Sequence, residues 1–346
     1  MKTENPLSVG THFPTSTLRD SNIELLRIVA MLLVMLIHAD FKAIGNPAFE
    51  ELVTAPADTF GRFFVGALSS VCVNAFILIS GWYGINFKLS GLNKLLFQVL
   101  FFMVLLSSLL LIWQTSSVAL LHALASNYWF VTAYILLFIL APVLNAFADY
   151  ADKSLFKMVL IILFLYQTLI SYIGNSAWYD DGYSPLPFLF LYLLARYMRL
   201  YSPRWCLLKK HTDMLIWVGL SLAVAVCSIT LLHLQMGGGR MYNYTSPVIV
   251  ASSVYFFLFF TKLNIASRPI NWIGKSAFAA FLLHMHPLFF DHCFACVICG
   301  WRMSQSLLSA YVFTIGYIFI LFFVAILIDK VRERLYFRLS ANKANL

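Results

Sequence analysis

The sequence has little charge for its length. Of its 346 residues, 11% are Asp, Glu, Lys or Arg, whereas 61% are hydrophobic. A soluble globular protein carries roughly twice that charged fraction, and the mean hydropathy here is +0.82. The shortage of charge excludes a soluble globular protein and predicts a polytopic membrane protein.

Neither an N-terminal signal peptide nor a disulfide framework is expected. Residues 1–20 are polar and contain several Ser, Thr and Pro residues, so they do not form a signal peptide and are expected to be a disordered tail. The six cysteines lie mostly inside or beside apolar runs, which argues against disulfides. Cys293, Cys296 and Cys299 have the spacing of iron–sulfur ligands but lack a fourth cysteine in context, so no metal site is expected.

Ten apolar runs are long enough to predict membrane-spanning helices. They cover residues 22–39, 63–80, 92–113, 128–147, 155–173, 186–200, 213–234, 247–263, 270–292 and 306–328. The run 186–200 is short and ends among arginines. The sequence therefore predicts an all-α bundle of about ten transmembrane helices over residues 21–329, followed by a basic tail over residues 330–346.

The distribution of the 24 basic residues predicts the orientation, because cytoplasmic loops are enriched in Lys and Arg. Most of them fall on the termini and the even-numbered loops, whereas Lys42, Arg62, Arg240 and Arg302 fall on odd-numbered loops. Both termini are therefore expected to be cytoplasmic. The net charge of +9 then favours anionic lipids or ligands and gives no support to nucleic-acid binding.

The first apolar run carries an arginine near one end and a histidine at the other. Ionisable groups inside a span are costly unless they face protein or a watery cavity, so each is a functional candidate. Arg27 and His38 fall within about 20° of one another around the helix and roughly 16 Å apart along its axis. Glu24 lies on the same face and can pair with Arg27. A structural role explains the spacing equally well. In that case Glu24 and Arg27 mark the membrane–water interface, and His38 ends the helix.

Several aromatic and basic residues are further candidates. The predicted outward loops contain Trp178 beside two aspartates and Arg240 after three glycines, a composition that suits a sugar but is also typical of an aromatic belt. Lys88 and Lys94 are expected on the cytoplasmic side, where snorkelling to lipid head groups is their ordinary role. His284 is expected in the outer half of its span, near the depth of His38.

Four groups of residues stand in the order of one known family. They are Leu26-Arg27 with His38, then Ile79-Ser80-Gly81, then Trp129 with Tyr134, Pro142 and Asn145, and lastly Ile273-Gly274-Lys275-Ser276 leading to Leu283-His284. The chain thereby resembles the acyltransferase-3 family, integral membrane acyltransferases that modify bacterial surface glycans. Longer relatives add a soluble esterase-like domain, and this chain is expected to act without one.

The resemblance implies a multi-pass enzyme of the inner (cytoplasmic) membrane. It would transfer acetyl from cytoplasmic acetyl-CoA to a sugar hydroxyl of an extracytoplasmic or lipid-linked polysaccharide. Arg27 and His38 match the family's essential pair, and Lys88 or Lys94 matches its basic cluster, which in the family is often tighter and rich in arginine. His38 would act as general base or carry the acetyl group covalently. Arg27 stays protonated and would hold donor phosphates together with the two lysines.

The acceptor would meet residues from several spans and loops. The expected contacts are Trp129, Tyr134, Trp178, Arg240 and His284. No carboxylate that orients His38 can be identified from the sequence. Acetyl-CoA is a cosubstrate, no permanently bound cofactor is expected, membrane lipid is a partner, and a homodimer is compatible with the sequence.

Two other functions compete with this interpretation. A transporter or flippase would also need a cavity with arginine, histidine and aromatic residues. Such proteins usually show internal repeats with paired broken helices, and no convincing repeat is evident here. A non-enzymatic anchor would not need a charged stripe across its first span.

Overall fold

The computed structural model describes residues 20–109, 126–174, 179, 182–236 and 238–344. These residues form helices and turns, with no strand among them. The α-helices are α1 Ser21–Ile37, α2 Phe49–Thr54, α3 Pro56–Ser69, α4 Cys72–Tyr83, α5 Leu89–Leu109, α7 Trp129–Tyr150, α8 Lys153–Tyr166, α9 Pro185–Tyr201, α10 Lys210–His233, α11 Pro247–Thr261, α12 Arg268–Gly274, α13 Phe278–His284, α14 Pro287–Phe289, α15 Cys296–Ser304 and α16 Leu307–Ala344. The π-helical segments are η1 His38–Ile44, η3 Gln167–Ile173 and η7 Phe290–Ala295, and the 3₁₀ turns are η5 Arg204–Leu207 and η6 Gly239–Tyr242.

The described residues confirm a polytopic bundle of helices. Eight helices are long and apolar enough to cross a membrane, and a bent pair raises the number to nine. Helix α9 has 17 residues and corresponds to the short run 186–200. Helix α16 continues through residue 330 into the predicted tail, where Arg332 is buried.

The predicted span 270–292 is divided into several pieces. Helix α12 ends at Gly274, α13 follows, and the chain then bends by 70° into Pro287–Ser304. Pro287 begins α14, because a proline has no N–H group with which to continue the preceding helix. The break leaves His284 at the end of α13, fully buried in the bundle.

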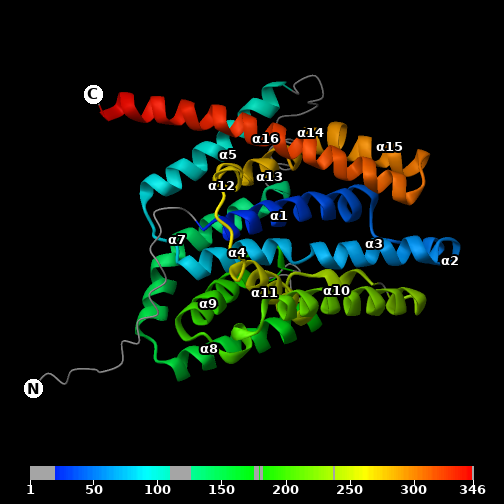
Figure 1. The fold of residues 1–346 in the computed structure, drawn as a ribbon, viewed down its shortest axis with the longest axis horizontal. Coiled ribbons are helices and arrows are strands. Elements are labelled where there is room, and N and C mark those ends of the chain that lie inside the picture. Colours follow the sequence, from blue (N-terminus) through cyan, green and yellow to red (C-terminus); the bar gives the residue numbers. More distant parts are fainter. Residues whose placement is uncertain (1–19, 110–125, 175–178, 180–181, 237, 345–346) are drawn as a thin grey trace, which may run out of the picture.

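Helix α1 occupies the middle of the bundle (Figure 1). It contacts α12, α13 and α16 on one side and α3, α4 and α11 on the other. Leu26, Ala30 and Met35 are completely or almost completely buried in these contacts. Polar side chains on α1 can therefore face other protein groups instead of lipid, which removes most of their cost.

The bundle has two ends, which are defined here by the course of α1. At its start, the side-chain amide of Asn22 donates to the carbonyl oxygens of Phe260 and Thr261 at the end of α11, at 3.1 and 3.2 Å. We call this the Arg27 end. The opposite end, where α1 passes into η1, is the His38 end.

Helices α4 and α9 pack closely at Gly81. A Cβ atom at this position would overlap the backbone oxygen of Tyr192 and the Cβ of Ala195. The neighbouring Ser80 hydroxyl donates to the carbonyl of Phe76 in its own helix at 2.9 Å. The small residues at the end of α4 thus permit the close helix approach that the sequence predicts.

Candidate active site

His38 lies where the regular α-helix of α1 ends. It is the first residue of η1, a π-helical segment in which the wider turn accommodates one extra residue. Single π-turns inside helices are frequent at functional sites. The histidine side chain is half-buried, so part of it is accessible from a cavity.

A second histidine fixes the orientation of the first. Nδ1 of His38 lies 2.9 Å from Nε2 of His284, and Nδ1 of His284 lies 2.6 Å from the carbonyl oxygen of Ala280. A carbonyl oxygen only accepts, so Nδ1 of a neutral His284 carries the proton and its Nε2 accepts from Nδ1 of His38. Nε2 of His38 then has a free lone pair, which is the state that a general base needs.

A large cavity opens beside His38 at the His38 end. Its volume is about 1760 Å³, including its open mouth, and its lining includes Lys42, Asn46 and Arg240 as polar groups. Nζ of Lys42 donates to the side-chain oxygen of Asn127 at 3.2 Å. The cavity is therefore an open space that presents hydrogen-bond donors near the histidine.

One wall of this cavity is aromatic. The ring centroid of Trp129 lies 4.7 Å from that of Tyr183 and 6.1 Å from that of Tyr244, and the two tyrosine rings are 5.3 Å apart. The three residues come from α7 and from two connecting segments that the sequence marks as aromatic. Such a wall offers an apolar face to a ring that also carries polar groups.

A smaller apolar pocket adjoins His38 and the large cavity. Its volume is about 380 Å³, including the space at its opening. His38, Trp129 and Tyr244 line both this pocket and the large cavity. Val34 and Met31 also line it, one turn and two turns before His38 on the same face of α1. The pocket therefore extends from His38 along α1 toward the Arg27 end.

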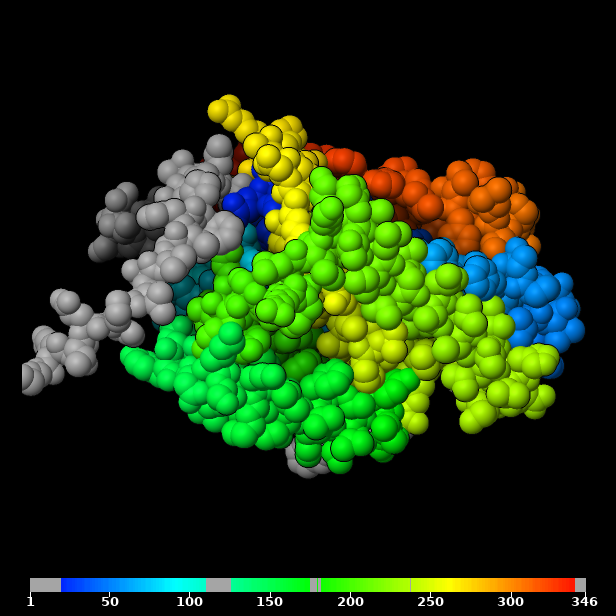
Figure 2. Space-filling model, turned by 60° about the horizontal axis from the view of Figure 1, so that its bottom comes forward, coloured from blue at the N-terminus to red at the C-terminus, as the bar shows by residue number. Residues whose placement is uncertain are grey.

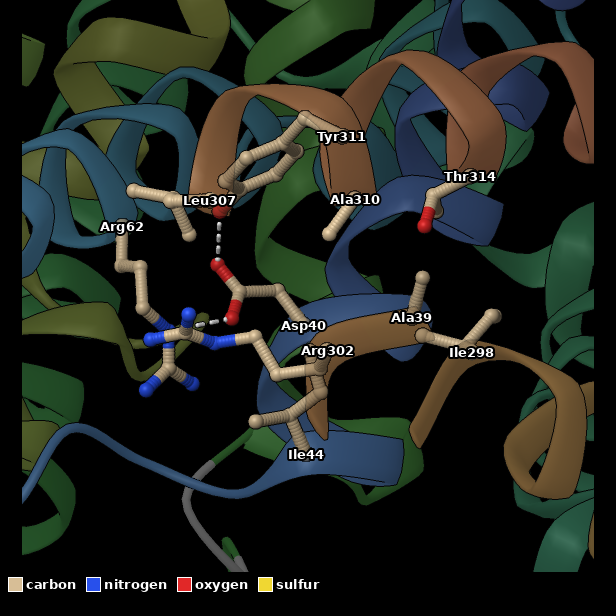
Figure 3. Close-up of a pocket in the computed structure, with 10 residues that line it drawn as sticks. All are labelled: Ala39, Asp40, Ile44, Arg62, Ile298, Arg302, Leu307, Ala310, Tyr311 and Thr314. Carbon is tan, nitrogen blue, oxygen red and sulfur yellow. Dashed lines mark hydrogen bonds and ion pairs between the residues drawn. The ribbon is translucent and has the colours of Figure 1, made fainter. Parts of the chain in front are cut away.

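Asp40 anchors the segment that carries His38 (Figure 3). Its Oδ1 accepts from Nε of Arg62 on α3 at 2.7 Å, and its Oδ2 accepts from the hydroxyl of Tyr311 on α16, also at 2.7 Å. Arg62 in turn donates to Oε2 of Glu51 at 2.8 Å and to the carbonyl of Gly45. Three helices thus hold η1 through one hydrogen-bonded network.

The charges in this network are compensated, which allows them to be buried. Asp40 and Arg62 are at most 2% exposed. Arg302 extends alongside them from α15, with its Nη2 3.7 Å from Oε2 of Glu51 (Figure 3). Removing one partner from such a buried pair typically costs about 3–5 kcal/mol, because it leaves the other charge uncompensated.

The predicted pairing of Arg27 with Glu24 is present. Nη1 of Arg27 donates to Oε1 of Glu24, whose side chain is 2% exposed, while that of Arg27 is 29% exposed. Arg27 is therefore oriented by a buried carboxylate and keeps part of its guanidinium accessible. This is the arrangement expected of an arginine that holds a ligand or marks an interface.

The structure does not join Lys88 and Lys94 to Arg27 by direct contact. Both lysines are exposed, and Nζ of Lys94 lies 3.9 Å from Oε1 of Glu333. Among the described residues, no hydrogen bond or ion pair links either lysine to Arg27. The three residues do share the Arg27 end, because α4 ends there with the Tyr83 hydroxyl 2.6 Å from Asp20 and α5 follows.

Only some of the residues predicted to contact the acceptor line the large cavity. Trp129 and Arg240 line the large cavity, and Arg240 also donates to the carbonyl of Ile173 at 3.1 Å. His284 lies behind His38 and is fully buried, and the Tyr134 hydroxyl is 3.2 Å from that of Ser80, away from this lining. Trp178 lies outside the described residues.

Sequence reasoning missed the contacts that orient His38. The partner proved to be His284, 246 positions away, and not a carboxylate. The sequence analysis included Arg62 only as a basic residue of an odd-numbered loop. Asp40 was not singled out, although it lies two residues after His38. Within the described part of the chain, no group of three or more His, Cys, Asp or Glu side chains could hold a metal ion.

The chain is similar to a known protein family. A family model described as an acyltransferase domain matches residues 20–330, which is nearly the whole chain. No curated protein and no solved structure matches the chain. The match covers the histidine pair, both cavities and every helix from α1 to α15, and the chain is a multi-pass membrane protein that belongs to the acyltransferase-3 family.

Proposed function

We propose that the chain is an O-acetyltransferase of the inner membrane that uses acetyl-CoA as donor and a sugar hydroxyl of an extracytoplasmic or lipid-linked polysaccharide as acceptor. The observation that carries this proposal is the position of His38. Its Nε2 is free to take a proton, and the residue stands where an open polar cavity meets an apolar pocket. That position suits a base that receives two substrates from opposite sides.

In the proposed reaction, His38 moves one proton. The acceptor hydroxyl gives its proton to Nε2 of His38 while its oxygen attacks the thioester carbon, and Nδ1–H of the resulting imidazolium keeps its hydrogen bond to His284. The new C–O bond forms, the C–S bond breaks, and the thiolate takes the proton from Nε2. The products are an acetylated sugar and coenzyme A with a free thiol.

The apolar pocket and the Arg27 end support a donor that enters from that end. The thin pantetheine arm of acetyl-CoA fits a narrow apolar pocket, whereas its phosphates require cations. Arg27 is partly exposed and lies roughly 16 Å from His38 along α1. In this proposal Arg27 binds phosphate directly, while the exposed Lys88 and Lys94 act as additional cations at the same end.

The large cavity supports a sugar acceptor. The aromatic wall of Trp129, Tyr183 and Tyr244 presents ring faces suited to the CH patches of a pyranose. Lys42 and Arg240 on the rim can donate to its hydroxyl groups. The opening admits the end of a long glycan, because only the reacting hydroxyl needs to reach His38.

The direct test is acetyl transfer by the purified protein in vesicles, with isotopically labelled acetyl-CoA and extracted surface glycan. His38→Ala should lower the rate by about 10²–10⁴-fold, the usual contribution of a positioned base. His211→Ala, at an exposed histidine at the start of α10, is the matched control and should keep the wild-type rate. Equal transfer by wild type and His38→Ala would reject His38 as the base.

A further inference from the structure

A long groove separates α8 from α11 on the outside of the bundle. Leu160 and Phe164 of α8 form one wall, Val250 and Val254 of α11 form the other, and Phe190 of α9 lies on the floor. Its volume is about 1210 Å³, including its open side. Figure 2 shows this face, with the yellow of α11 recessed between the green of α8 and the yellow-green of α10.

The groove faces the membrane and needs an apolar occupant. Helices α8 and α11 belong to two of the candidate spans, so their outer surfaces lie against hydrocarbon. Wall residues recur at three- and four-residue steps along each helix, which makes the groove run parallel to the helices. Water gains no hydrogen bonds from such a lining, whereas an acyl chain fills it with dispersion contacts.

One end of the groove is basic. Lys157 lines it one turn before Leu160, and Lys153 lies one turn earlier still on α8. Arg204 precedes Trp205, whose indole also lines the groove. Within the described residues no carboxylate pairs with Lys157, and Asp152 is engaged in capping α8 through Ser154 and Leu155.

This basic end coincides with the Arg27 end of the bundle. The guanidinium of Arg199, in the last turn of α9, lies 5.0 Å from the ring centroid of Trp82 near the end of α4. Pro203 and Trp205 follow α9 directly and close the groove there. A tryptophan with neighbouring cations is typical of the level of the lipid head groups.

We propose that the groove binds one acyl chain of an anionic phospholipid from the leaflet at the Arg27 end. The chain lies between α8 and α11, and the head group lies against Lys157, Lys153 and Arg204, beside the Trp205 indole. One cation at the membrane surface strengthens binding of an anionic lipid by about fivefold. The site is independent of the proposed acetyl transfer, since it lies outside both cavities that meet at His38.

The test is lipid retention by the full-length protein, measured by native mass spectrometry with phosphatidylglycerol and phosphatidylcholine of identical acyl chains. Wild type should retain one phosphatidylglycerol in clear preference to phosphatidylcholine. Lys157→Gln should weaken that retention about fivefold, whereas Lys210→Gln, at an exposed lysine at the same end but outside the groove, should not. Ala251→Trp should fill the groove and abolish retention, with Val143→Trp on the exposed face of α7 as its control.

Three results would overturn the proposal. The first is equal retention of the two lipids by wild type. The second is unchanged phosphatidylglycerol retention in both Lys157→Gln and Ala251→Trp. The third is a dimer that Ala251→Trp dissociates, because a second copy of the chain would then occupy the groove. A variant that fails to fold is recognised by the loss of its monodisperse peak on gel filtration. Lys157→Gln leaves the apolar walls of the groove unchanged.

Discussion

At the level of single residues, the proposed chemistry depends on which nitrogen of His38 is free. The hydrogen bonds that link His38 to His284 and His284 to the carbonyl oxygen of Ala280 determine this. The carbonyl oxygen can only accept, so each histidine must donate from its Nδ1. A carboxylate would orient the same histidine and would also add a negative charge. The neutral arrangement keeps the buried interior of the bundle free of that charge.

We expect His284→Ala to lower kcat about 10–100-fold with the KM for acetyl-CoA unchanged. The substitution removes the acceptor for Nδ1–H of His38, and a hydrogen bond to a charged imidazolium is worth about 1.5–3 kcal/mol. His284→Gln offers an amide oxygen in its place and should recover part of the rate. Steady-state kinetics of all three proteins measures the effect, and a His284→Ala enzyme with wild-type kcat would refute it.

Arg27→Ala should raise the KM for acetyl-CoA by about 10–100-fold, since one charge-assisted hydrogen bond to phosphate is lost. The same change also removes an ion-pair partner of Glu24. The double variant Glu24→Gln/Arg27→Ala also removes the negative charge of Glu24. It therefore separates the loss of a phosphate contact from the loss of the ion pair. An unchanged KM in the double variant would show that Arg27 serves the fold and not the donor.

The candidate residues could be selected from the sequence, whereas most of their contacts could not. Arg27 and His38 could be chosen because ionisable groups are rare in apolar runs, and the Glu24 pair followed from helical spacing. The contact of His38 with His284 joins α1 to α13, and a single sequence carries no information on which distant helices pack together. For the same reason, the hydrogen bonds of Asp40 with Arg62 and Tyr311 could not be predicted from the sequence.

At the level of elements, η1 is the part of the bundle on which the site depends most. A π-helical turn is less favourable than an α-turn and persists where surrounding contacts hold it. Asp40 supplies such contacts by binding α3 and α16 at once. Loosening any of them should move His38 before it unfolds the bundle.

Tyr311→Phe tests this role of η1. The substitution removes the hydroxyl that donates to Asp40 and keeps the ring. It should lower the free energy of unfolding by about 1.5–3 kcal/mol and reduce kcat. Tyr317→Phe is the matched control on α16, since its hydroxyl donates to the neutral carbonyl of Cys293 at 3.0 Å. Thermal unfolding and transfer rates should change more in Tyr311→Phe, and equal changes in the two variants would contradict the role of η1.

The boundaries of a helix could be predicted from the sequence where its composition determines them. They could not be predicted where contacts with other helices determine them. The apolar runs located the long helices well, because hydrophobic length is a direct consequence of bilayer thickness. The run 270–292 looked continuous because its residues are apolar throughout, although Pro287 was visible in it. Whether a proline bends or divides a span depends on the neighbours that satisfy the freed backbone groups.

At the level of the whole molecule, basic residues gather at the Arg27 end. Lys330 there lies over the ring of Trp272 at 4.9 Å, and Lys262 pairs with Asp213 at 2.5 Å. The cationic side chains at the His38 end include Lys42 and Arg240 at the large cavity. By the positive-inside rule, the Arg27 end should face the cytoplasm.

Cysteine labelling in intact cells tests this orientation. Asn46 lines the large cavity, and Lys210 lies at the Arg27 end. Each is replaced by cysteine in turn. A membrane-impermeant maleimide should label position 46 in intact cells and position 210 only after permeabilisation, above the background of the six native cysteines. The reverse pattern would place the large cavity in the cytoplasm.

The meeting of two cavities at one histidine has an energetic consequence for the cell. If His38 returns to the thiolate the same proton that it takes from the sugar, then each turnover exchanges one acetyl group for one proton and moves no net charge. In the proposed reaction, modification of the outer surface would therefore not draw on the proton-motive force.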